Sequence, residues 1–197
     1  PLTKDKTAVL RVFAKMFYNH CGFYGDDLKI AKLERFIEKQ GKTQQFREAF
    51  EKVNGAPWTE TRDSFAFFED DIVAVLQSTL GMSEQAARNW FNGEETNELS
   101  IAQLVADIQE YVDGKGKDFR LLFMVDEVGQ YIGDDGDLMI NLQSLVEEIG
   151  IRCHGKVWVM VTSQEAIDSV VHITGNDFSK IQGRFNTRLS LSSSSVD

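Results

Sequence analysis

Two uninterrupted apolar runs dominate the C-terminal half of the chain. They are Leu121–Val125 (LLFMV) and Val157–Val161 (VWVMV), and between them apolar residues recur at helical spacing over residues 138–149. A short, continuous apolar run is typical of a strand that is buried on both faces, as in a parallel sheet. The order strand, helix, strand predicts a βαβ unit, with turn-rich residues 129–136 leading into the crossover helix.

The N-terminal half has a different pattern, in which apolar residues recur every three to four positions. This spacing predicts helices over residues 6–20, 27–40, 43–54, 62–80, 84–91 and 100–112. We therefore expect a mostly helical portion, residues 1–112, followed by an α/β segment, residues 113–197. The fold class predicted is α/β, with a parallel-sheet core preceded by a helical N-terminal portion.

Two acids, Asp126 and Glu127, come directly after the first apolar run. In open parallel sheets, ligands bind beyond the carboxyl ends of the strands. Aspartate there suits a Mg²⁺ ion held partly through water, and glutamate suits polarising an attacking water molecule. The pattern is that of a Walker B element in a P-loop ATPase. The alternative is an acidic pair that enters a turn.

The second apolar run is followed by Thr162, Ser163 and Gln164. Because the carboxyl ends of parallel strands meet at one edge of a sheet, we expect these residues beside the two acids. A hydroxyl or amide there can sense a γ-phosphate or hold the attacking water. The alternative role for Thr162 and Ser163 is to cap the N-terminus of a following helix.

Two arginines, Arg184 and Arg188, precede Leu189-Ser190-Leu191, which suits a short strand. The guanidinium group is planar, permanently charged and bidentate, so an arginine at the ligand edge suits contact with a neighbouring subunit's nucleotide. The alternative is a structural salt bridge or a solvated surface pair.

One sequence that ends like a phosphate-binding loop, Gly41-Lys42-Thr43, is rejected as one. Phe36 stands where the first glycine of the motif would be, and a charged, helical stretch precedes it instead of a strand. We therefore identify no Walker A motif. Since neither end looks like a natural terminus, we expect the chain to be a piece of a longer protein.

Composition narrows the classes of function. The 197 residues are 42% hydrophobic and carry a formal net charge of −10, which predicts a globular fold without an overall positive field for nucleic acid. In the helix predicted at residues 27–40, Glu34 and Glu38 lie among lysines and an arginine, which predicts a solvated helix face. Only two cysteines occur, Cys21 and Cys153, and they lie far apart in sequence, which favours a reducing compartment. They form no C-x-x-C motif, which argues against a zinc site. With neither a signal peptide nor a membrane-spanning run, we expect a cytoplasmic protein.

Beyond these local patterns, the chain resembles the BrxC family, the large P-loop ATPases of BREX bacteriophage-exclusion systems. The segments that carry the resemblance most specifically are VDEVGQ (125–130), VTSQE (161–165) and KIQGRF (180–185). Further segments, among them KMFYNHCGFYGDDLKIAKLERFIEKQGKT, SFAFFEDD and ARNWFNGEE, extend it over nearly the whole chain.

The resemblance implies a partial, AAA+-like P-loop NTPase core that serves bacterial antiviral defence, with ATP and Mg²⁺ as cofactors. It assigns Asp126 to the Mg²⁺ site and Glu127 to catalysis, and it places Ser163, with Thr162 as second choice, at the sensor position. Two further residues, Arg184 and Arg188, fall where related ATPases carry arginine fingers.

The resemblance also implies a homo-oligomer that works with other BREX proteins, with indirect DNA association and no membrane. Without a Walker A motif, the chain by itself should bind nucleotide weakly or not at all. The alternative from a different class is a nucleotide-independent interaction module, whose helical half docks protein partners of the defence complex.

Overall fold

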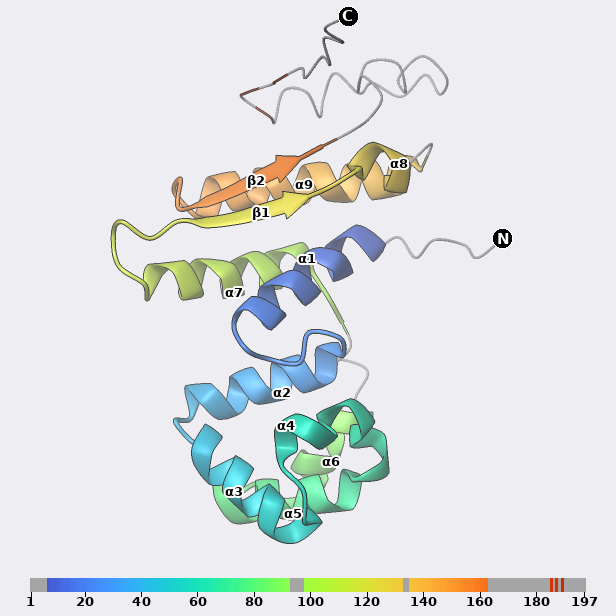
Figure 1. Ribbon diagram of the computed structural model, residues 1–197, viewed down its shortest axis with the longest axis vertical. Coiled ribbons are helices and arrows are strands. Elements are labelled where there is room, and N and C mark those ends of the chain that lie inside the picture. The colour runs from blue at the N-terminus through green and yellow to red at the C-terminus, as the bar shows by residue number, and fades with distance from the viewer. Residues whose placement is uncertain are drawn as a thin grey trace, which may run out of the picture. The chain divides into compact units, whose positions relative to one another are not determined.

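The computed structural model describes residues 7–92, 98–132 and 135–162, and the single residues Phe185, Thr187 and Leu189. Contacts divide the chain into two compact units, Arg11–Leu99 and a second unit made of Pro1–Leu10 with Ser100–Asp197. The division passes through helix α1 (Ala8–His20), at the blue end of the ribbon in Figure 1.

The unit Arg11–Leu99 is helical in its described residues. Its elements after α1 are α2 (Leu28–Lys39), α3 (Thr43–Asn54), α4 (Trp58–Thr61), the 3₁₀ helix η1 (Arg62–Phe67), α5 (Glu69–Leu80) and α6 (Glu84–Asn92). Helix α3 packs on α5, and α5 packs on α6. The fully buried side chains at the centre of this core include Ile30, Phe46, Phe50, Trp58, Ile72 and Leu76.

The single helix predicted over residues 62–80 is wrong. The chain forms η1 and then α5, and Phe68 lies between them with φ −121° and ψ 24°, outside the helical region. Helix α5 begins with three acids in its first turn. Acids are favoured at a helix N-terminus by the helix dipole, so they mark a new start within a stretch whose apolar spacing looks continuous.

The second unit contains the sheet and follows the predicted order. Its elements are α7 (Ile101–Asp113), β1 (Leu121–Val125), α8 (Val128–Ile132), α9 (Gly136–Arg152) and β2 (Val157–Val161). Strands β1 and β2 pair in parallel, with Leu121 opposite Val157 and Val125 opposite Val161. The predicted α/β organisation with a parallel βαβ unit is therefore confirmed. The stretch at residues 129–136, predicted as turn-rich, begins within the short helix α8, which the sequence pattern did not predict.

Burial of β1 and β2 on both faces, as their apolar runs predict, is also wrong for the described residues. Helix α9 lies along one face of the pair (Figure 1), where Leu121, Phe123 and Val157 are buried. The side chains that alternate with them stay exposed, since no second helix of the described part of the chain covers them. Within that part the sheet has two strands, so β1 has one neighbour there.

Neither cysteine forms a disulfide bond. Cys153, which follows α9, is buried, and this burial raises the pKa of its thiol to about 11. The thiol is therefore neutral at physiological pH. Among the described residues, no helix combines the length and the apolarity that crossing a membrane requires.

Candidate functional site

The residues that follow the two strands are held together by backbone hydrogen bonds. The Thr162 N–H donates to the Val125 carbonyl, and the Val128 N–H donates to the Thr162 carbonyl, both at 3.0 Å. These bonds continue the strand pairing just beyond Val125 and Val161. The prediction that polar residues after β1 and β2 meet at one edge of the sheet is thereby confirmed for Asp126, Glu127 and Thr162.

The Thr162 hydroxyl connects both acids. It donates a hydrogen bond to Asp126 Oδ1, and it accepts one from the Glu127 N–H at 3.0 Å. One side chain from the end of β2 thus fixes the Asp126 carboxylate and the Glu127 backbone. The Thr162 hydroxyl therefore holds the Asp126 carboxylate and the Glu127 backbone N–H close together.

Glu127 has an unusual backbone conformation, with φ +52°. The left-handed region is uncommon for residues other than glycine, and residues held there cost of order 1–3 kcal/mol each. Two hydrogen bonds support this conformation: the Glu127 N–H donates to Thr162, and the Glu127 carbonyl accepts from the Tyr131 N–H at 3.2 Å. Strained residues of this kind cluster at functional sites, which makes Glu127 the natural centre of a candidate site.

We expect Thr162→Val to release the Glu127 amide. Valine has nearly the shape of threonine but cannot accept the hydrogen bond, which is worth about 1 kcal/mol. Hydrogen exchange of the Glu127 amide should therefore become about fivefold faster. Thr162→Ser keeps the hydroxyl and should keep the slow exchange. Equal exchange rates in the valine and serine variants would show that the hydroxyl does not hold this amide.

The donor set suits magnesium. Mg²⁺ prefers hard oxygen ligands, keeps several waters, and is commonly bound through one or two carboxylates together with substrate phosphates. Asp126 is exposed at the carboxyl end of β1, so its carboxylate can contribute such a ligand. Groups of three or more histidine, cysteine or acidic side chains that could hold a metal by themselves do not occur in the described residues. A phosphate-bearing partner would have to complete the coordination.

The other predicted site residues lie outside the described part of the chain. These are Ser163, Gln164, Arg184 and Arg188. Their sensor, nucleotide-binding and arginine-finger roles therefore stay predictions. The rejected phosphate loop lies within the described part: Gly41 connects α2 to α3, with a helix before it and not a strand, as expected.

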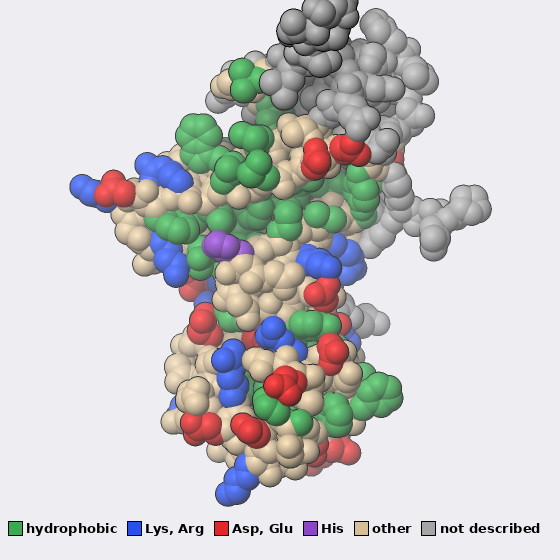
Figure 2. All heavy atoms as spheres, in the orientation of Figure 1, with side chains coloured by type: hydrophobic (Ala, Val, Ile, Leu, Met, Phe, Trp, Pro, Cys, Tyr) green, Lys and Arg blue, Asp and Glu red, His purple; other side chains and the backbone are tan. Residues whose placement is uncertain are grey.

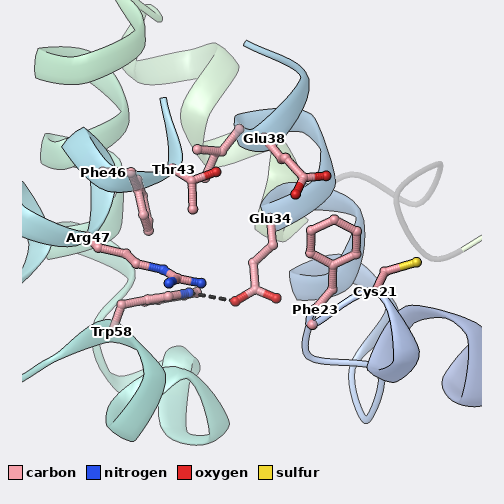
Figure 3. Close-up of a pocket in the computed structure, with 10 residues that line it drawn as sticks. Cys21, Phe23, Glu34, Glu38, Thr43, Phe46, Arg47 and Trp58 are labelled. Atoms are coloured by element: carbon pink, nitrogen blue, oxygen red, sulfur yellow. Dashed lines mark hydrogen bonds between the residues drawn. The ribbon is translucent and has the colours of Figure 1, made fainter. Parts of the chain in front are cut away.

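A second polar cluster, which the charge pattern of α2 did not predict, surrounds Glu34 in the helical unit. Glu34 lies on α2 and lines a pocket of about 130 Å³, together with Phe46, Arg47 and other residues (Figure 3). Its carboxylate accepts from the Tyr24 N–H at 2.6 Å, from Trp58 Nε1 at 2.7 Å and from an Arg62 guanidinium nitrogen at 2.9 Å.

The solvated position predicted for Glu34 is wrong, because its exposed fraction is 8%. The sequence carried a signal of this, since Glu34 follows Ile30 by four positions and precedes Ile37 by three. That spacing places it on the buried face of α2. Three donors already surround the carboxylate, so we assign it a structural role.

A comparison of the chain with protein-family models found no match, and a comparison with solved structures found none either.

Proposed function

We propose that this chain is part of an ATP-binding and ATP-hydrolysing module of the AAA+-like P-loop class, in a protein of bacterial phage defence. One observation carries the proposal. Asp126 and Glu127 lie at the carboxyl end of a parallel strand, where the hydroxyl of Thr162, which follows the neighbouring strand, forms hydrogen bonds with both. This is the edge at which parallel sheets bind their ligands. The resemblance to the BREX ATPases rests on the same residues, within VDEVGQ and VTSQE.

Each acid has a distinct part in the proposal. Asp126 would hold Mg²⁺, which neutralises charge on the phosphates when it is bound. Glu127 would orient and deprotonate the attacking water, for which its side chain must be held in a fixed direction. The left-handed backbone of Glu127, together with the hydrogen bond from its N–H to Thr162, favours one direction for the Glu127 side chain. The phosphate-binding loop would come from another part of the longer protein, and neighbouring subunits would supply the arginine.

The proposal is tested by the magnesium dependence of ATP hydrolysis in a polypeptide that joins this chain to a Walker A segment. Asp126→Asn should raise the Mg²⁺ concentration required for hydrolysis at least tenfold, because it removes the charge that binds the ion. Asp118→Asn is the matched control, since Asp118 is an exposed acid before β1, at the opposite end of the strand. An unchanged magnesium requirement in Asp126→Asn would contradict the assignment.

The alternative proposal, a nucleotide-independent interaction module, is favoured by a different observation. The sheet exposes apolar side chains that a self-sufficient hydrolase core would cover. The two proposals differ in cells: phage resistance that survives both Asp126→Asn and Glu127→Gln would favour the interaction module.

A further inference from the structure

We draw no further inference here: the strongest candidate, the apolar face that β1 and β2 leave exposed (Figure 2), formed by Leu122, Met124, Trp158 and Met160, carries none, because part of the same unit lies outside the described residues and nothing in the structure shows what covers this face.

Discussion

Glu127→Gln should abolish ATP turnover while ATP binding persists. Glutamine keeps the size and the hydrogen-bonding capacity of glutamate but cannot accept the proton of the attacking water. Loss of a general base typically costs about 10²–10⁴ in rate, whereas contacts to bound ATP do not involve the base. The measurement is steady-state phosphate release together with equilibrium ATP binding, in a polypeptide that joins this chain to a Walker A segment.

The matched control for this experiment is Glu110→Gln, because Glu110 is an exposed glutamate on α7 of the same unit. It should turn over ATP at the unaltered rate. Turnover near the unaltered rate in Glu127→Gln would show that Glu127 is not the base. Loss of ATP binding together with turnover would instead indicate that Glu127 supports the fold of the site, through its left-handed backbone.

Glu34→Ala should destabilise the helical unit by about 3 kcal/mol. The substitution leaves the buried Trp58 indole N–H and the Tyr24 N–H without their acceptor, and it removes the ion-pair partner of Arg62. An unsatisfied buried donor costs about 1–3 kcal/mol, and breaking a buried ion pair from one side costs about 3–5 kcal/mol. The Arg62 side chain is 21% exposed and can regain water, so we expect a loss of stability at the lower end of the range for a broken buried ion pair.

The measurement is urea unfolding followed by tryptophan fluorescence, in a Trp158→Phe background. The remaining tryptophans, Trp58 and Trp90, then report on the helical unit alone. Glu38→Ala is the matched control, since Glu38 lies one turn further along α2 and is exposed, and it should change the free energy of unfolding by less than about 0.5 kcal/mol. Equal stability of the two alanine variants would contradict the structural role of Glu34.

Local sequence was enough to predict the elements that carry the site. The two apolar runs predicted β1 and β2 at their observed bounds, because five residues are the usual length of a strand and too few for a typical helix. Helix starts were also predicted within a residue or two where a capping side chain marks them. Asp27 accepts hydrogen bonds from the backbone of α2, and Ser100 accepts one from the backbone of α7.

Local patterns predicted less well where a break or a short helix interrupts them. Phe65, Phe68 and Ile72 keep helical spacing across the junction of η1 and α5, so apolar periodicity does not register the change at Phe68. The short helix α8 was missed because glycines and aspartates dominate the stretch around it. Propensity over so few residues is a weak determinant compared with the contacts that a segment makes.

The sequence by itself determined that two parallel strands end in polar residues, since apolar runs and the βαβ order act over short distances along the chain. Only the tertiary structure decided which polar atoms meet. Thr162 and Asp126 are 36 positions apart, and Glu34 and Trp58 are 24 apart, so their hydrogen bonds form only once the elements have packed. Burial is decided in the same way. An apolar side chain such as Met124 is exposed or covered according to what lies on its face of the sheet. The residues next to it in the sequence do not determine this.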